Sequence, residues 1–361
     1  VQTCALPIYS VLDQCGINYS NNDNMDRRRQ EIKKMCEYLY PDDSTYEGKE
    51  LRLKQEYFLC SAGVQSLIKK FKKRGVDLRE LDKYLAIHIN DTHPSLVIPE
   101  LMRILMDEEN LGWNKAWEVT TKVCSYTNHT IMQEALEVWP GHMLQSLLPR
   151  IYMIIQEIDR RYIDYLRTSK GYSTSKIDRM KIIDNYGHVR MANMDCMCCH
   201  SINGVAALHT EILKEETLHD FYTDKPEAFN NKTNGIAHRR WLISANPSLT
   251  NLFNNYFEHE DWQVDLRHLK ELNKETNNAY LLECLEDIKY HNKINFIKTM
   301  NLDVNPDSIF DVQIKRIHMY KRQIMNVLRI MMIYNDLLEN PDMAFYPMTF
   351  IMGGKAAASY R

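Results

Sequence analysis

The fold class can be deduced from the stretch Ile309-Phe-Asp-Val-Gln-Ile-Lys-Arg-Ile-His-Met-Tyr-Lys-Arg322. Its first six residues have the apolar composition of a strand. An amphipathic pattern follows over Lys321–Leu338, and a second apolar run, Met348–Met352, stops at Gly353-Gly354. Strand, helix and strand of these lengths predict a right-handed βαβ unit in a parallel sheet. The sequence therefore predicts an α/β protein.

Cationic side chains collect where the first of these strands ends. Lys315, Arg316, Lys321 and Arg322 surround His318 between the strand and the helix start. Ligands of parallel sheets bind beyond the carboxyl ends of the strands, and backbone N–H groups at a helix start favour an anion. Arginine also binds phosphate in a bidentate manner. The pattern indicates a phosphate site, and the alternative interpretation of the charges alone is a solvated helix face.

Three further polar clusters are candidates for binding a hydroxyl-rich ligand. Asn90-Asp-Thr-His-Pro94 follows the apolar run Tyr84–Ile89 and offers a carboxylate and an imidazole at a predicted strand end. The alternative role, a turn with a helix cap, is the commoner one for such residues. Tyr126–Thr130, with the glutamates that follow it, and Asn230–Gly235 are weaker signals, because a lone histidine or asparagine more often has a structural role.

Composition argues against several classes of function. The 361 residues carry 45 basic and 48 acidic side chains, a net charge of -3, so we expect no nucleic-acid partner. No apolar run approaches the ~20 residues of a membrane-spanning helix. With 12 glycines and no glycine-rich phosphate motif, any bound phosphate must be held mainly by side chains. The length predicts about two domains.

Cysteine usage predicts reduced thiols. The chain has nine cysteines and opens on Val1 without a secretory signal, which indicates a cytoplasmic protein. Cys196-Met-Cys-Cys-His200 resembles a metal-binding pair, but zinc sites space their cysteines two to four residues apart and use four ligands. Strand alternation through the apolar stretch Met191–Cys199 would also point Cys198 and Cys199 to opposite faces. We therefore predict no metal and place these cysteines in the core.

Taken in chain order, these clusters closely resemble the α-glucan phosphorylases, the family of glycogen, starch and maltodextrin phosphorylases. The resemblance covers about residues 36 to 361. The motifs that carry it are Tyr40-Pro-Asp-Asp-Ser-Thr-Tyr-Glu-Gly-Lys-Glu-Leu-Arg-Leu-Lys-Gln-Glu-Tyr57, Asn90-Asp-Thr-His-Pro-Ser95, Tyr126-Thr-Asn-His-Thr130, His200-Ser-Ile-Asn-Gly-Val205, Asn231-Lys-Thr-Asn-Gly-Ile236, Phe310-Asp-Val-Gln-Ile-Lys-Arg-Ile-His318 and Gly353-Gly-Lys-Ala-Ala357.

The resemblance implies two Rossmann-like domains of the glycosyltransferase-B type, both incomplete here, with the active-site cleft between them. Residues 1–35 would be an irregular and partly non-native lead-in. Residues 36–230 would belong to the amino-terminal domain, and 231–361 would form the first part of the cofactor-binding carboxy-terminal domain. The implied reaction is reversible phosphorolysis of α-1,4-glucan ends by orthophosphate, giving glucose 1-phosphate with retention. The family acts in glycogen metabolism, has allosteric members and forms homodimers at full length.

The resemblance also implies the cofactor pyridoxal 5'-phosphate, which this family uses through its phosphate group. The lysine that forms the Schiff base is expected beyond the end of this chain, so the 361 residues alone are expected to be inactive. Lys315 would approach the cofactor phosphate. Arg316 and Lys321 would hold the substrate phosphate. Met319 stands where the family usually has a glutamate.

The sugar-binding residues are carried over in the same way. His129 and Asn234 would bind the sugar at its 6-hydroxyl end, and the His129 carbonyl would lie near the developing oxocarbenium charge. The acceptor side would be lined by Asp91, His93 and Glu134, with Arg52 as a further substrate-binding residue. The gate loop over the active site would consist of Asp42, Asp43, Ser44, Thr45 and Tyr46.

Two other functions remain open at this stage. One is a nucleotide-sugar glycosyltransferase of the same architecture, whose cations would hold a diphosphate. The other is a glucan-binding module without turnover. Pyridoxal absorbance and release of glucose 1-phosphate distinguish the phosphorylase from the nucleotide-dependent enzyme. A glucan-binding module would bind oligosaccharide regardless of orthophosphate.

Overall fold

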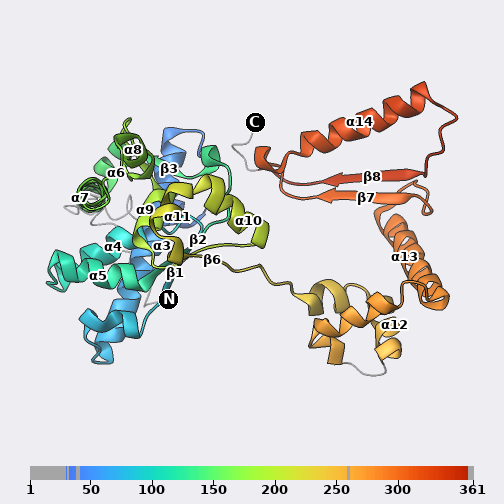
Figure 1. Ribbon diagram of the computed structural model, residues 1–361, viewed down its shortest axis with the longest axis horizontal. Coiled ribbons are helices and arrows are strands. Elements are labelled where there is room, and N and C mark those ends of the chain that lie inside the picture. The colour runs from blue at the N-terminus through green and yellow to red at the C-terminus, as the bar shows by residue number, and fades with distance from the viewer. Residues whose placement is uncertain (1–29, 31, 38–40, 258–260, 357–361) are drawn as a thin grey trace. The chain divides into compact units, whose positions relative to one another are not determined.

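The chain forms two compact units. The computed structural model describes residues 30, 32–37, 41–257 and 261–356 (Figure 1), and its contacts divide the chain into units 1–234 and 235–360. Both units contain parallel strands with helical connections, which confirms the α/β class. Most of the predicted lead-in 1–35 lies outside the described residues, and residues 32–37 are helical. The assignment of each part to a phosphorylase domain stays a prediction.

The first unit is built on a four-stranded parallel sheet of order β1-β2-β5-β6. Its strands are β1 (Ile87–Asn90), β2 (Cys124–Thr127), β5 (Ile202–Gly204) and β6 (Phe229–Asn231). A separate antiparallel pair consists of β3 (Val138–Pro140) and β4 (His188–Arg190). Because the four strands of the main sheet are parallel, all their carboxyl ends meet at one edge.

Helices fill every connection of this sheet. Before β1 come α3 (Tyr46–Lys73) and the 3-10 helix η1 (Leu78–Lys83). Between β1 and β2 lie α4 (Val97–Arg103), the π-helical turn η2 (Ile104–Glu108) and α5 (Trp113–Val123). Between β2 and β5 lie η3 (Gln133–Ala135), α6 (Gly141–Leu147), α7 (Pro149–Thr168), α8 (Thr174–Met180) and α9 (Met191–Cys198). Between β5 and β6 lie α10 (Ala207–Ile212), η4 (Leu213–Thr217), α11 (His219–Asp224) and η5 (Pro226–Ala228).

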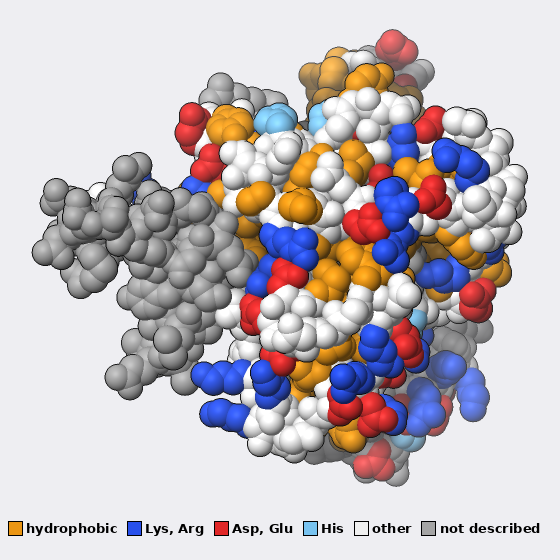
Figure 2. All heavy atoms as spheres, turned by 90° about the vertical axis from the view of Figure 1, so that its left-hand side faces the viewer, with side chains coloured by type: hydrophobic (Ala, Val, Ile, Leu, Met, Phe, Trp, Pro, Cys, Tyr) orange, Lys and Arg blue, Asp and Glu red, His pale blue; other side chains and the backbone are white. Residues whose placement is uncertain are grey.

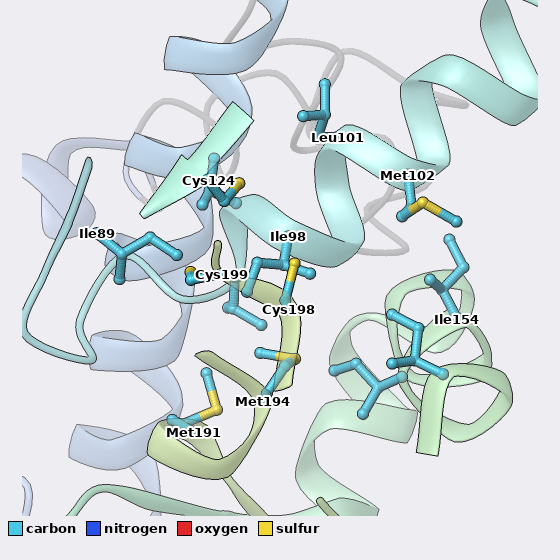
Figure 3. Packing of buried hydrophobic residues seen from close by; sticks show 14 of the residues in the cluster. Ile89, Ile98, Leu101, Met102, Cys124, Ile154, Met191, Met194, Cys198 and Cys199 are labelled. Carbon is cyan, nitrogen blue, oxygen red and sulfur yellow. The ribbon is translucent and has the colours of Figure 1, made fainter. Parts of the chain in front are cut away.

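The core of this unit joins the sheet to α4, α7 and α9. All seven residues of α4 are buried. The face of α7 that the sequence predicts to be apolar is buried as well, with Ile151, Ile154, Ile155 and Ile158 at most 2% exposed. Figure 3 shows the packing of these helices, with Ile154 close to Met102 and Met194 close to Cys198. Burying each large aliphatic side chain stabilises the fold by roughly 1.5–3 kcal/mol.

Several short elements differ from the sequence predictions. The stretch Met191–Cys199 forms helix α9 rather than a strand, so the alternation argument about its cysteines was wrong. The cysteines are nevertheless buried, as expected. β2, β5 and β6 occupy segments that the sequence presents as polar clusters or breaks, because backbone hydrogen bonds to neighbouring strands define them. Within the described residues, no three His, Cys, Asp or Glu side chains are placed to share a metal ion.

The second unit contains the predicted βαβ arrangement. Strands β7 (Ile309–Ile314) and β8 (Met348–Gly353) are parallel and paired along their whole length. They are joined by η9 (Met319–Lys321) and α14 (Gln323–Glu339). The preceding helices are η6 (Arg239–Ser244), α12 (Pro247–Phe257), η7 (Asp261–Gln263), η8 (Leu266–Lys274) and α13 (Ala279–Met300). Phe253, Phe257 and Trp262 form a small aromatic core.

Charges of both signs share the surface of the first unit. Figure 2 shows Lys and Arg side chains interspersed with Asp and Glu on the face that it views. Surface ion pairs such as Arg150–Asp107, at 2.6 Å, join neighbouring helices, and each is worth at most about 1 kcal/mol. Across the described part of the chain, no helix combines the length and the apolar character needed to cross a membrane.

Candidate functional site

Four predicted site residues follow strand ends at one edge of the first unit, which we call the carboxyl edge. Asp91 and His93 follow β1, His129 follows β2, and Asn234 follows β6. Hydrogen bonds connect these loops to each other. His129 Nε2 lies 2.7 Å from Asn90 Oδ1, and the Asp91 amide donates to the Thr127 carbonyl at 2.9 Å. The sheet therefore gathers residues that are up to 143 positions apart, from Asp91 to Asn234, along one edge.

The turn after β1 has an unusual backbone conformation. Asp91 has φ +63°, in the left-handed region that non-glycine residues rarely adopt. Aspartate tolerates it because its side chain bonds to its own turn, and here Asp91 Oδ1 accepts from the Thr92 amide at 2.9 Å. His93, His129 and Asn234 are exposed and Asp91 is half-buried. The side chains are thus available to a ligand while the backbone is held.

Arg52 lies on α3 and contacts three carboxylates. Its Nε donates to Glu56 at 3.1 Å, its Nη1 to Asp43 at 2.8 Å, and its Nη2 to Glu137. Glu137 also accepts from Thr92 Oγ1 at 2.9 Å. Arg52 therefore connects the predicted gate loop, through Asp43, with the turn after β1. Its predicted role in binding substrate stays a prediction.

One of the carboxyl groups around Arg52 keeps its proton at neutral pH. Burial raises the pKa of Glu56 to about 9, and the charge of Glu137 acts in the same direction. Arg52 opposes this shift but does not overcome it. With Glu56 neutral, one of the three carboxyl groups that accept from the guanidinium carries no charge.

The predicted gate loop is tightly joined to the start of α3. Thr45 caps the helix by accepting from the Gly48 amide at 3.0 Å, and Asp42 Oδ1 accepts from the Ser44 amide at 3.1 Å. A Cβ atom on Gly48 would lie 1.7 Å from the Asp42 carbonyl oxygen, so this close approach requires glycine. Asp43 contacts Arg52, and Tyr46 is the first residue of α3. The gating role itself stays a prediction.

The structure gives specific contacts to residues that the sequence analysis named only as members of its polar clusters. Glu137 and Thr92 lie between Arg52 and the turn after β1. His209 accepts from the Val205 amide at 3.0 Å, and burial together with His129 lowers its pKa. The only sequence signal for this contact was the spacing of Val205 and His209, which are four residues apart at a helix start. Glu134 lies in η3, and its side chain falls outside the described atoms.

The cationic segment 315–322 lies in the second unit and adopts a defined loop. Lys315 Nζ donates to the Lys321 carbonyl at 3.1 Å, and Gln323 Nε2 donates to the Arg316 carbonyl at 2.8 Å. The Lys315 amide donates to the Gly353 carbonyl at 3.1 Å. A Cβ on Gly354 would lie 2.3 Å from the Lys315 carbonyl oxygen. Both strand ends therefore meet here, as the βαβ prediction requires.

The electrostatics of this segment suit an anion. Lys315, Arg316 and Arg322 are exposed, and Lys321 is half-buried. None of these four cations forms an ion pair with a carboxylate from the described ranges. Partial burial lowers the pKa of His318, and the charges of Arg316 and Lys321 lower it further. The histidine is therefore neutral near pH 7, and the fixed cations set the charge of the loop.

Comparison with known proteins identifies the family. Residues 8–361 match the family model described as Carbohydrate phosphorylase. The chain belongs to the carbohydrate phosphorylase family. Glycogen phosphorylase of Bacillus subtilis (strain 168) is 46% identical over 336 residues, covering 92% of this chain and 42% of the relative. The muscle form of Homo sapiens is 43% identical over 337 residues, covering 89% of this chain and 40% of the relative. The resemblance predicted from the motifs is confirmed.

This carbohydrate phosphorylase chain spans about two fifths of the length of the curated relatives it matches. The described residues carry two groups of polar side chains with different chemistry. Carboxylate, imidazole and amide groups at the carboxyl edge can hydrogen-bond sugar hydroxyls. Guanidinium and ammonium groups after β7 can neutralise phosphate. The role of each individual residue stays a prediction.

Proposed function

We propose that this chain is part of an enzyme that catalyses reversible phosphorolysis of α-1,4-glucan ends by orthophosphate, releasing glucose 1-phosphate with retention. The observation that carries the proposal is the cationic loop after β7, folded and free of carboxylate partners among the described residues, in a chain of the carbohydrate phosphorylase family. Relatives named glycogen phosphorylase support the same reaction.

Arg316 and Lys321 are proposed to hold the substrate phosphate. Orthophosphate carries one to two negative charges near pH 7, and its attack on the anomeric carbon requires it to be oriented and its charge balanced. Arginine supplies a planar pair of donors, while lysine supplies a compact charge. Fixed cations that need no rearrangement during the reaction are an effective form of electrostatic stabilisation.

The carboxyl edge is proposed to hold the glucan. His129 and Asn234 would bind the reacting glucose unit, and the carbonyl of His129 would face the positive charge that develops at the anomeric carbon. Asp91, His93 and Glu134 would bind the neighbouring units on the acceptor side. The gate loop 42–46 would move only if the ion pair between Asp43 and Arg52 breaks. Arg52 would thus influence access to the acceptor side.

Pyridoxal 5'-phosphate is the cofactor that the family implies, and the loop after β7 fits its phosphate group. Lys315 is exposed, has no carboxylate partner within the described atoms, and lies at the strand end beside Gly354. It is proposed to hold the cofactor phosphate, next to Arg316. When bound, the cofactor phosphate supplies acid and base chemistry to the substrate phosphate. We further propose that the full-length enzyme is a cytoplasmic homodimer.

The test is release of glucose 1-phosphate from maltoheptaose and orthophosphate by the full-length enzyme. Arg316→Ala should lower the rate at least a hundredfold, in line with the loss of one group that stabilises transition-state charge. Lys298→Ala, which removes an exposed lysine from the end of α13, should leave the rate unchanged. A nucleotide-sugar enzyme would release no glucose 1-phosphate. A glucan-binding module would bind maltoheptaose equally well with and without orthophosphate, and Arg316→Ala would change nothing.

A further inference from the structure

Asp195 is a fully buried carboxyl group that lies behind the carboxyl edge. It belongs to α9, and its residue is 0% exposed. Its Oδ2 atom lies 2.6 Å from Ser95 Oγ, and its Oδ1 atom is buried without a hydrogen-bond partner among the described residues. An ionised carboxylate with an unpaired oxygen in such a place would be very costly.

The surroundings of Asp195 favour its protonated form. Burial raises its pKa well above the usual value, and the charges of Glu137 and Asp91 raise it further, against the hydrogen bond from Ser95. Asp195 also raises the pKa of the buried thiols and phenol around it, which are those of Cys60, Cys124, Cys196, Cys198, Cys199 and Tyr126. Their pKa is raised mainly by burial, and for Cys124 first by its hydrogen bond with Cys198, so these groups are neutral. Together with the unpaired Oδ1 atom, this favours a protonated carboxyl group, which can donate a hydrogen bond to Ser95 Oγ.

A donor at Asp195 orients a chain of hydrogen bonds that ends in the turn after β1. Ser95 Oγ lies 2.7 Å from the Thr92 carbonyl oxygen. The Ser95 hydroxyl has a single hydrogen to donate. If Asp195 donates to Ser95, that hydrogen is free to bond to Thr92. An ionised Asp195 would compete for the same hydrogen. The neutral form thus completes the contact with Thr92, and the charged form weakens it.

Thr92 is the residue on which this turn depends. Its amide donates to Asp91 and its hydroxyl donates to Glu137, while its carbonyl accepts from Ser95. The neighbouring Asp91 is held in the left-handed region, a conformation that persists only where the surrounding structure maintains it. Asp91 and His93 flank Thr92 directly, so their positions follow from its position.

We propose that Asp195, in its protonated form, is a positioning residue for the acceptor side, where it fixes Asp91 and His93 through Ser95 and Thr92. It contacts neither glucan nor phosphate. The inference rests on the proposed function, in which Asp91 and His93 bind the acceptor side. It predicts that loss of Asp195 affects glucan binding selectively.

The experiment compares Asp195→Ala with Asp195→Asn in the full-length enzyme. Asparagine can donate from Nδ2 to Ser95 Oγ, so KM for maltoheptaose should stay within about twofold of the wild type. Alanine cannot donate, and KM for maltoheptaose should rise about tenfold while KM for orthophosphate is unchanged. Ser95→Ala should reproduce the alanine result, and the double variant should add nothing, because both residues act through one chain.

Asp159→Ala is the matched control. Asp159 is also a buried aspartate, but its Oδ1 accepts from the Ile182 amide at 2.6 Å, away from the turn after β1. Its loss should lower the unfolding midpoint without changing KM for maltoheptaose. If Asp159→Ala and Asp195→Ala raise this KM equally, or if Asp195→Asn behaves like Asp195→Ala, the proposed role of Asp195 is wrong.

Two further readouts separate this inference from the proposed function. The infrared absorption of protonated carboxyl groups near pH 7, to which Glu56 also contributes, should lose the intensity of one group in Asp195→Asn but not in Asp159→Asn. Equilibrium binding of maltoheptaose should weaken about tenfold in Asp195→Ala. A wild-type enzyme that releases no glucose 1-phosphate overturns the proposed function, while an unchanged infrared band or unchanged glucan affinity overturns the inference on Asp195.

Discussion

At the scale of single residues, Arg52 shows how one side chain can hold several segments together. Its guanidinium joins Asp43, Glu56 and Glu137, which come from three different parts of the first unit. We expect Arg52→Ala to lower the free energy of unfolding by about 1–3 kcal/mol, because it leaves partly buried carboxyl groups without their partner. Arg52→Lys should recover part of this loss. Urea unfolding followed by tryptophan fluorescence measures both, and an unchanged midpoint for Arg52→Ala would contradict the proposed connection.

Glu56 gives a prediction about pH. Its pKa is about 9 in the folded protein, against the ordinary glutamate value of 4.5 in the unfolded chain, so between these values the folded state binds the additional proton. Stability from this group is therefore complete below about pH 4.5 and is lost as the pH rises toward 9. Glu56→Gln, which keeps an acceptor for Arg52, should flatten the decline of the urea midpoint between pH 6 and pH 9. Glu47→Gln, an exposed position on the same helix, should leave the decline as it is in the wild type.

At the scale of elements, the start of α3 depends on one glycine. A methyl group on Gly48 would collide with the Asp42 carbonyl oxygen, so Gly48→Ala must separate the gate loop from the helix. We expect a loss of roughly 1–3 kcal/mol in the free energy of unfolding. Gly63→Ala is the matched control, because a Cβ there meets nothing within 4 Å. It should stabilise the chain by about 0.5–1 kcal/mol. Equal effects from both substitutions would show that the close approach at Gly48 has no consequence.

The elements also show what the sequence could and could not predict. α7 and the βαβ arrangement from Ile309 to Gly353 were predictable, because apolar spacing and a glycine pair are local signals. β5 and β6 were not, since each has three residues whose strand character comes from hydrogen bonds to distant segments. α9 is buried on nearly all sides, so its apolar run shows no periodicity that separates a helix from a strand.

The candidate site likewise contains residues that the sequence could predict and residues that it could not. Asp91, His129 and Asn234 could be named from motifs at predicted strand or loop ends, and the parallel sheet places them along one edge. Glu137 was named only among the glutamates that follow Tyr126–Thr130, and Asp195 was missed. Nothing in the local sequence marks a carboxyl group as buried, because burial is decided by helices and strands that pack from elsewhere in the chain.

At the scale of the whole molecule, the two units differ in the depth of their cores. In the first unit, β1, β2, α4 and α9 contribute to one large buried cluster. In the second, the buried cluster consists of Phe253, Phe257 and Trp262, and no residue of β7, α14 or β8 is buried. Backbone hydrogen bonds that are not covered by apolar side chains open easily, so the units should differ in local stability.

Hydrogen exchange followed by mass spectrometry tests this difference on the 361-residue chain. Amides of β7 and β8 should exchange at least a hundredfold faster than those of β1 and β2, although both pairs are fully hydrogen-bonded parallel strands. The pairing geometry is the same, so the burial of the side chains is the variable that remains. α12 contributes Phe253 and Phe257 to the aromatic cluster, so its amides should exchange at an intermediate rate. Uniform protection across β1, β2, β7 and β8 would mean that the two units unfold as one cooperative body, and that burial does not set their local stability.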